Sequence, residues 1–382
     1  MCLAGVRSAC LRPAEHPDLD GPVAGGAACN RAAGFWQNLL HPRRPHAAGA
    51  AIVVVSGRTG QERFRMRRVA AIGECMIELC EHPDGRITRA FGGDTLNTAL
   101  YLARLGVPTD YITALGDDPW SEEMLSAWQA EGVATGSVIR LEGRLPGLYM
   151  IQTNPRGERR FSYWRASAPA RDLFALPQTP SLCAALAQFT HLYLSGISLS
   201  LYGTAGRATL FTALAQARKG GSKIVFDTNF RPGGWPDRSE AMTAYRTVLS
   251  MADLVFASVE DLALLSGADW QGLLEPHWQH AEIVLKLEHP ACRIGRGDAL
   301  LEIAAEPVST VVDTTAAGDS FAAAYLCARL QGCAPAAAAR AGHVLARVVV
   351  QHRGAVIPRQ AWPSAELVAA GLSKGLSGNV GT

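Results

Sequence analysis

The chain has 382 residues, of which 48% are apolar and 18% are charged, and its formal net charge is +2. This is the composition of an ordinary globular protein with ample material for a core, and the small net charge gives no sign of nucleic-acid binding. The longest apolar run near the N-terminus, Ala47–Val55, is far shorter than the roughly 20 residues of a membrane span. The nine cysteines follow no disulfide or zinc spacing, so we expect free thiols and a reducing, cytoplasmic location.

The first 65 residues differ in composition from the rest of the chain. They are rich in Ala, Gly, Pro and Arg and show no sustained helix or strand period, so we expect disorder there. Either translation begins later, at Met66, or the extension is a targeting or linker segment. We expect one folded domain over residues 66–365 and a flexible tail over residues 366–382.

From residue 68 onward, short apolar segments alternate with helical patterns. The predicted strands are Val69–Gly73, Tyr111–Ala114, Leu192–Ser195, Lys223–Asp227, Leu254–Ala257 and Ile283–Leu287, and the clearest helices are Thr95–Leu105, Thr204–Arg218 and Ser320–Leu330. Several strands are continuous apolar runs, which is typical of strands covered on both faces. The alternation predicts an α/β fold of three layers, with a mostly parallel central sheet between helices.

One region breaks this alternation. Residues 144–165 read as strand, turn and strand, with the turn at Asn154–Gly157, and Ile87–Phe91 also has strand character. Such a pattern indicates a hairpin rather than a crossover unit. We therefore expect a small β-sheet lid over the ligand cleft, with its strands within about residues 86–92 and 144–165.

The most informative motif is Asp313–Phe321, which reads Asp-Thr-Thr-Ala-Ala-Gly-Asp-Ser-Phe and precedes a helix rich in small residues. Free N–H groups at a helix N-terminus bind anions, and small residues let the backbone approach a ligand. Asp319 lies at this helix start, where it can take a proton from an attacking hydroxyl group. The alternative is that Asp313 or Asp319 only caps the helix.

A second motif, Phe91–Asn97, contains the glycine pair Gly92 and Gly93 followed by Asp94 and Asn97. Asp94 and Asn97 lie one helical turn apart and could both bind the hydroxyl groups of a polyol. The alternative is a tight turn in which Asp94 serves as an N-cap.

A third motif, Asp227–Pro232, follows a predicted strand at the end where open α/β sheets bind ligands. Arg231 in this motif and Arg165 at the end of the hairpin are candidates to bind a carboxylate or phosphate group. The alternative for each arginine is an exposed surface side chain.

With these motifs the chain resembles the ribokinase-like (PfkB) carbohydrate kinase family, over roughly Arg68 to Pro363. The Asp313–Asp319 segment is similar to the family's signature, except that the family usually has Gly where Ala316 stands. The Ala-Ala-Gly-Asp form, together with Gly73–Leu79 and Tyr163–Arg165, resembles the branch that phosphorylates 2-dehydro-3-deoxygluconate. The resemblance thus implies a ribokinase-like fold and transfer of the ATP γ-phosphate to the 6-hydroxyl of this sugar acid.

The resemblance also implies roles for individual residues. Asp319 would be the catalytic base beside an anion hole formed by Ala316, Ala317 and Gly318. The substrate would contact Gly92, Gly93, Asp94, Asn97, Tyr149, Arg165 and Arg231, with the two arginines near its carboxylate. ATP would contact Asn229, Arg231, Ser258, Lys286, Ala316 and Gly318. Magnesium would bridge the phosphates without a certain protein ligand, Asp261 being a candidate for indirect contact, and a monovalent cation such as K⁺ would bind near the signature loop.

Two segments depart from the family pattern. The Asn-x-x-Glu motif is replaced by Ser258–Asp261, and the glycines of the nucleotide loop Lys-x-Gly-x-x-Gly are replaced by Glu288 and Ala291. A carboxylate at Glu288 would repel ATP phosphates, so we expect weaker nucleotide contacts.

Two alternatives to the sugar-acid kinase stay open. One is a kinase of the same family that acts on a neutral sugar such as ribose or fructose. The other is a sugar-binding regulatory protein with a degraded nucleotide loop. In each case the expected partners are small molecules rather than nucleic acid or membrane, and the exposed edge of the lid makes a homodimer an expectation of the resemblance.

Overall fold

The structure is a computed structural model that describes residues 67–82, 84–153, 159–296 and 299–372. The extension over residues 1–65 and the hairpin turn at residues 154–157 lie outside the described residues. The expected boundary at residue 365 is wrong, because helix α13 (Ser364–Ala369) crosses it and both Leu367 and Leu372 are buried. The folded domain therefore extends to at least Leu372.

An eight-stranded sheet forms the centre of the fold, in the order β14-β13-β12-β11-β10-β9-β1-β4. Its strands are β1 (Val69–Ile72), β4 (Thr109–Ile112), β9 (His191–Ser195), β10 (Lys223–Asp227), β11 (Leu254–Ser258), β12 (Glu282–Lys286), β13 (Ala291–Arg296) and β14 (Ala299–Ala304). The strands from β4 to β12 pair in parallel, and β13 and β14 add an antiparallel edge. The predicted parallel strands are all present, with bounds that match for β10 and differ by at most two residues for the others, whereas β13 and β14 were not predicted.

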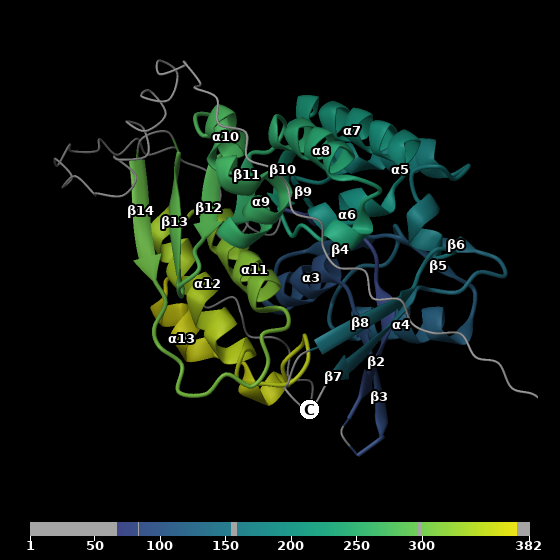
Figure 1. The fold of residues 1–382 in the computed structure, drawn as a ribbon, viewed down its shortest axis with the longest axis horizontal. Helices are drawn as coiled ribbons and strands as arrows, with labels where there is room; N and C mark the ends of the chain where they lie inside the picture. The colour runs from purple at the N-terminus through teal and green to yellow at the C-terminus, as the bar shows by residue number, and fades with distance from the viewer. Residues whose placement is uncertain (1–66, 83, 154–158, 297–298, 373–382) are drawn as a thin grey trace, which may run out of the picture. The chain divides into compact units, whose positions relative to one another are not determined.

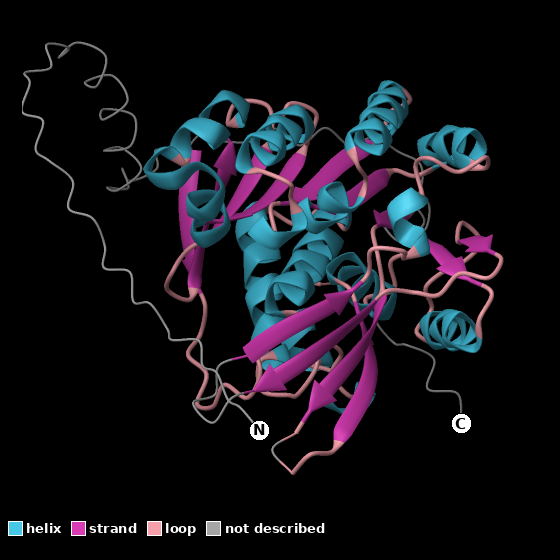
Figure 2. Ribbon diagram, turned by 45° about the vertical axis from the view of Figure 1, so that its right-hand side comes forward, coloured by secondary structure: helices cyan, strands magenta, loops and turns pink. Residues whose placement is uncertain are grey.

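Helices cover both faces of this sheet, as Figures 1 and 2 show. One layer contains α3 (Asp94–Arg104), α4 (Pro119–Ala130), α11 (Ala317–Leu330), α12 (Pro335–Val349) and α13, and the other contains α5 (Thr179–Ala185), α6 (Gly196–Leu201), α7 (Thr204–Lys219), α8 (Arg238–Leu249), α9 (Val259–Ser266) and α10 (Gln271–Leu274). Helix α11 is buried along almost its whole length because alanines let it pack closely against α3 and α12. This packing fixes where the N-terminus of α11 lies.

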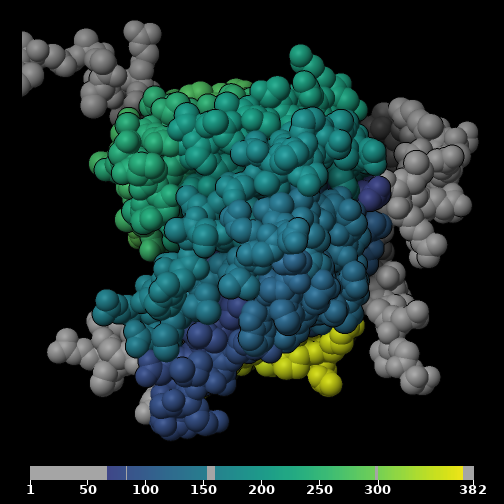
Figure 3. Space-filling model, turned by 90° about the vertical axis from the view of Figure 1, so that its right-hand side faces the viewer, coloured from purple at the N-terminus to yellow at the C-terminus, as the bar shows by residue number. Residues whose placement is uncertain are grey.

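A four-stranded sheet in the order β3-β2-β7-β8 forms the lid. Its strands are β2 (Met76–Glu81), β3 (Ile87–Gly92), β7 (Leu148–Thr153) and β8 (Arg159–Trp164), and a separate pair joins β5 (Ala114–Gly116) to β6 (Ile139–Leu141). Figure 3 shows the lid projecting from the body at the lower left. The edge strand β8 exposes Phe161, Tyr163 and Trp164. The predicted lid is confirmed, with β2 as an additional strand.

The carboxyl ends of the parallel strands meet at one edge of the large sheet. Asp227 ends β10, Ser258 ends β11 and Lys286 ends β12, and the lid strand β2 starts shortly after β1 at this same edge. Parallel strands necessarily bring their carboxyl ends together, and this edge is where ligands of open α/β sheets bind. Polar residues separated in the sequence are thereby gathered in one place.

Candidate active site

The N-terminus of α11 carries the Asp313–Phe321 motif. The helix begins after Ala316, which has a left-handed backbone with φ of 60° and gives no side-chain cap. Asp319 lies in the first turn and therefore does not cap the helix, whereas Asp313 organises the preceding loop by accepting hydrogen bonds from Thr315 N (2.9 Å) and Gly354 N (3.1 Å). The capping alternative is thus wrong for Asp319.

The candidate anion hole is part of this turn. The N–H of Ala317 donates to Thr314 O at 3.2 Å, so this amide is engaged within the loop. Gly318 lies beside Lys286, since a Cβ added to Gly318 would be 3.3 Å from Lys286 Nζ. The partial positive charge of the helix N-terminus and a lysine ammonium therefore meet at the start of α11.

Asp319 is joined directly to helix α3. Asn97 Nδ2 donates to Asp319 Oδ2 at 2.8 Å, and the hydroxyl of Thr98 donates to Asp319 O at 3.4 Å. Burial and then the nearby charge of Asp94 raise the pKa of Asp319 to about 8, while the Asn97 hydrogen bond and Lys286 oppose this shift. The Gly92–Asn97 motif and the Asp313–Asp319 motif thus share one site, and its carboxyl group has the pKa of a base suited to near-neutral pH.

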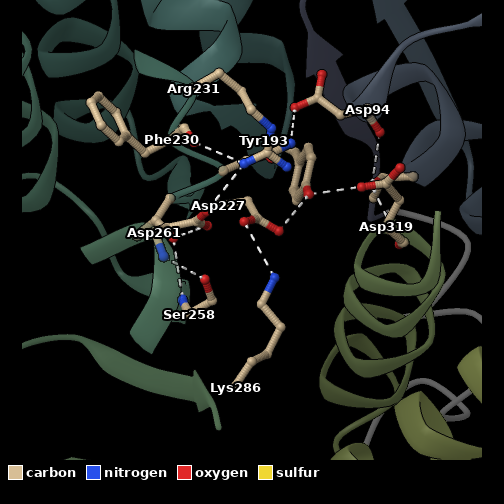
Figure 4. A network of polar contacts seen from close by, with 12 residues as sticks. Asp94, Tyr193, Asp227, Phe230, Arg231, Ser258, Asp261, Lys286 and Asp319 are labelled. Carbon is tan, nitrogen blue, oxygen red and sulfur yellow. Dashed lines mark hydrogen bonds and ion pairs between the residues drawn. The ribbon is translucent and has the colours of Figure 1, made fainter. Parts of the chain in front are cut away.

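Asp94 links α3 to the segment after β10. The N-cap of α3 is Gly93, so Asp94 is the first helical residue, and its Oδ2 accepts a hydrogen bond from Asn229 Nδ2 at 2.7 Å. Asn229 has a positive φ of 24°, a sparsely populated backbone conformation that often occurs at functional sites. The interpretation of Asp94 as an N-cap is wrong, and Asp94 faces the same space as Asp319 (Figure 4).

Asp227 and Lys286 form the centre of this network (Figure 4). Lys286 Nζ lies 3.6 Å from Asp227 Oδ1, and the hydroxyl of Tyr193 donates to Asp227 Oδ2 at 3.5 Å. Burial raises the pKa of Asp227 to about 6, although the charge of Lys286 opposes this. Asp227 begins the third sequence motif, but neither it nor Tyr193 was predicted to be a site residue. The position of Asp227 at the end of a buried strand is the signal that could have identified it.

Ser258, Asp261 and Arg231 form the outer part of the network. Ser258 caps α9 by accepting the N–H of Asp261 at 3.0 Å. The carboxylate of Asp261 accepts hydrogen bonds from Thr228 Oγ1 at 3.0 Å and from Arg231 Nη1 at 3.1 Å. The side chain of Arg231 is 59% exposed, as the surface alternative expects, although it pairs with Asp261. Asp261 is held close to Asp227 without joining a metal cluster. Among the residues that the structure describes, no group of three His, Cys, Asp or Glu side chains is arranged to hold a metal ion.

The base of the lid carries the remaining predicted contacts. Arg165, just after β8, forms an ion pair with Glu74, whose side chain is 2% exposed. Burial raises the pKa of Glu74 and Arg165 opposes the shift. The hydroxyl of Tyr149 donates to Glu78, and a Cβ on Gly92 would lie 2.2 Å from that hydroxyl oxygen. Glu74 and Glu78 were not predicted to be site residues, because the pattern of a single strand does not show which carboxylates face the base of the lid.

The segment in the place of the nucleotide loop is a tight connection between β12 and β13. Leu287 N donates to Ala291 O at 3.0 Å, Glu288 is exposed, and Ala291 is buried.

No helix in the described part of the chain is long and apolar enough to cross a membrane.

A buried carboxylate at a helix N-terminus, a half-buried lysine beside it and a small sheet projecting from an α/β core suit phosphoryl transfer. Comparison with protein families agrees, since residues 66–362 match the pfkB family of carbohydrate kinases. The chain belongs to this family, and it is therefore a sugar kinase.

Individual relatives show which sugar kinases the chain is similar to. The chain is 45% identical over 309 residues to the 2-dehydro-3-deoxygluconokinase of Dickeya dadantii (strain 3937), which covers 78% of this chain and 99% of the relative. It is 42% identical over 308 residues to the enzyme of the same name from Escherichia coli (strain K12), with the same 78% and 99% coverage. The fold is similar to that of a fructokinase from Xylella fastidiosa with bound ATP, with a TM-score of 0.69 and 23% identity over 80% of this chain and 98% of that one.

Proposed function

We propose that this protein transfers the γ-phosphate of ATP to the 6-hydroxyl of 2-dehydro-3-deoxy-D-gluconate, giving the 6-phosphate and ADP. The hydrogen bond between Asn97 and Asp319 carries this proposal, because it joins the polyol-binding turn to the base at the start of α11. The similarity to enzymes named 2-dehydro-3-deoxygluconokinase over nearly their whole length supports the choice of substrate.

In the proposed reaction Asp319 takes the proton of the attacking hydroxyl group. The hydroxyl oxygen then bonds to the γ-phosphorus as the bond from phosphorus to ADP breaks. The backbone N–H groups of Ala316 and Gly318 would bind the phosphoryl oxygens, and that of Ala317 would join them by giving up its hydrogen bond to Thr314 O. Because burial raises the pKa of Asp319 to about 8, only a minority of its carboxyl groups are ionised near pH 7, and this ionised fraction is basic enough to accept the proton.

The sugar acid would lie between the lid and α3. Gly92, Gly93, Asp94, Asn97 and Tyr149 are the proposed contacts for its hydroxyl groups. Its carboxylate would bind Arg165, because a guanidinium group has enough donors to hold Glu74 on one side and a second carboxylate on the other.

ATP would bind along the carboxyl ends of β10, β11 and β12. Its proposed contacts are Asn229, Arg231, Ser258, Lys286, Ala316 and Gly318. Mg²⁺ would arrive with ATP and neutralise phosphate charge, and the carboxylates of Asp227 and Asp261 suit hydrogen bonds to its water ligands. The loop that Asp313 organises is our proposed place for a monovalent cation. The requirement for ATP and the free cysteines Cys75, Cys292 and Cys327 favour the cytoplasm.

A panel of substrates tests the proposal. We expect purified protein to release ADP rapidly with 2-dehydro-3-deoxygluconate and only slowly with ribose, fructose or gluconate. Asp319→Asn should lose nearly all of kcat, and Arg165→Ala should raise KM for the sugar acid at least about tenfold. Arg160→Ala, at an exposed position of β8, the strand that precedes Arg165, is the matched control and should change KM little.

The second candidate is a kinase for a neutral sugar. It is favoured by one observation, namely that Arg165 is already paired with Glu74 and so has less charge to offer a substrate. Rapid turnover of ribose or fructose, with no response to Arg165→Ala, would replace the first proposal by this one. Binding of the sugar acid without measurable binding of Mg-ATP in calorimetry would instead favour a regulatory protein.

A further inference from the structure

The side chain of Lys286 lies between the carboxylate of Asp227 and the N-terminus of α11. It ends β12, and its side chain passes over the end of β11 to reach Asp227 on β10 (Figure 4). Its Nζ also lies against the start of α11, because a Cβ on Gly318 would be only 3.3 Å away. One ammonium group therefore lies next to both a buried carboxylate and the helix N-terminus at which the phosphoryl group would be held.

The pairing of Lys286 with Asp227 is loose. The distance of 3.6 Å from Nζ to Oδ1 exceeds the 2.7–2.9 Å or so of a charge-assisted hydrogen bond. Oδ1 of Asp227 is buried and accepts no hydrogen bond in the described part of the chain. By contrast, the exposed pair of Lys223 with Asp253 closes to 2.9 Å. Lys286 is thus held near Asp227 without forming a charge-assisted hydrogen bond to it.

The charges around the site explain why a cation is needed there. Asp94, Asp227, Asp261 and Asp319 all face one space, while Arg231 is used by Asp261. A phosphoryl group entering this space is repelled by each of these carboxylates that is ionised. Burial lowers the pKa of Lys286, but the charges of Asp227, Asp261 and Asp319 outweigh this and raise it, so the ammonium form is maintained.

We propose that Lys286 is a catalytic residue whose ammonium group leaves Asp227 and binds the oxygens of the transferring phosphoryl group. As the sugar oxygen–phosphorus bond forms and the bond to ADP breaks, the hydroxyl proton goes to Asp319 and Lys286 keeps all its protons. Asp227 is then the resting partner of the lysine. This inference rests on the proposed kinase activity but does not depend on which sugar is the substrate.

A double-mutant cycle on the full chain separates this role from simple charge compensation. We expect Lys286→Met to lower kcat about 100-fold or more with little change in KM for the sugar. In the Asp227→Asn background, Lys286→Met should still cost about as much, because the lysine acts on the phosphoryl group. If Lys286 only neutralises Asp227, the double mutant will match Asp227→Asn, and the proposal is overturned. Lys223→Met, which breaks an ion pair at the opposite end of β10, is the control and should leave kcat unchanged.

A binding measurement covers the case in which Asp227→Asn is too slow to assay or Lys286→Met folds poorly. The double mutant removes both buried charges together, which proteins often tolerate. We expect its Kd for Mg-ADP to stay within about threefold of the Asp227→Asn value, whereas the tighter binding seen when aluminium fluoride and sugar are added should be lost. Equal tightening in both variants would refute the role of Lys286. A wild-type protein that phosphorylates no sugar would refute the proposed function instead, so the two failures are distinguishable.

Discussion

At the scale of single residues, Asp319 combines functional value with a cost to stability. Burial and Asp94 raise its pKa from the ordinary value of 3.8 to about 8. The folded protein therefore binds a proton at this group between about pH 4 and pH 8 that the unfolded chain has released. Because stability falls with pH wherever the folded state binds more protons, ionisation of Asp319 destabilises the fold across this range.

Replacement of Asp319 by Asn should reveal this cost. We expect the Tm of Asp319→Asn, measured as the difference from wild type, to increase from pH 4 to pH 8 and then to level off. At about 2–4 °C per kcal/mol, this difference should reach several degrees. Thermal melts of the ligand-free proteins across this pH range provide the measurement. The exposed Asp269→Asn is the control, and a difference for Asp319→Asn that stays flat with pH would show that its carboxyl group is not perturbed by folding.

Ala316 is a second residue of interest, because its backbone conformation is one that residues other than glycine rarely adopt. Its φ of 60° costs an L-residue roughly 1–2 kcal/mol, whereas glycine adopts this conformation freely. Glycine also adds about 0.4–1 kcal/mol of unfolded-state entropy, which offsets part of the gain.

We therefore expect Ala316→Gly to leave stability unchanged or to raise it by up to about 1 kcal/mol. The matched control is Ala208→Gly at an exposed position of α7, which should lose about 1 kcal/mol as glycine does in a helix. Urea unfolding of the three proteins gives both values. Equal losses in the two variants would contradict the left-handed conformation of Ala316.

At the scale of secondary-structure elements, the site depends on how the N-terminus of α3 packs against the segment that leads from β1 to the lid. Gly93 has an extended backbone with φ of −177°, so conformation alone does not require glycine there. Space does, since a Cβ would lie 2.2 Å from the backbone oxygen of Glu74 and 3.2 Å from Cys75 Cα. Backbone atoms cannot move aside as a flexible side chain can.

Gly93→Ala should therefore displace the helix start that carries Asp94 and Asn97. We expect kcat/KM to fall at least about tenfold and stability to fall by roughly 1–3 kcal/mol. Steady-state kinetics and thermal melts measure the two effects. Gly203→Ala is the control, because Gly203 precedes α7 with open space around its Cα and should show neither loss. Wild-type behaviour of Gly93→Ala would mean that this contact relaxes without moving α3.

The same scale shows what the sequence could predict and what it could not. The six parallel strands of the large sheet were recognised because they are buried, and several of them read as continuous apolar runs. The lid strand β2 was missed because Glu78 and Glu81 interrupt its apolar pattern, and β13 was missed because Arg293 and Arg296 do the same. Partly exposed strands carry a weaker signal than buried ones.

At the scale of the whole molecule, the motifs predicted which residues matter but not their pairing. Asp319 and Asn97 stood out in separate motifs, and only the packing of α11 on α3 makes them hydrogen-bond partners. The pairs of Asp227 with Lys286 and Glu74 with Arg165 were not predicted, because each depends on which strands are neighbours in the sheets. The order of the strands in the sheets thus decides which charged side chains interact, and the residue types alone do not show this.

Contacts at the start of the described fold indicate how much of the chain is needed for activity. The family match begins at residue 66, and the described fold begins with Arg67, which donates to Leu330 O, and Arg68, which forms an ion pair with Asp110 at 3.0 Å. The first strand, β1, is flanked by β4 and β9 and contributes the fully buried Val69. All of these contacts are retained in a protein that starts at Met66.

We therefore expect a protein of residues 66–382 to keep the kcat and KM of the full chain and its Tm within about 2 °C. The control is a protein starting at Ala70, which loses both arginine contacts and Val69 from an interior strand of the large sheet. Burial of a Val side chain is worth about 1.5–3 kcal/mol, so this shorter protein should melt at least several degrees lower or fail to fold. If the protein starting at Met66 also loses activity or stability, residues 1–65 take part in the folded enzyme, and the domain boundary proposed from the sequence is wrong.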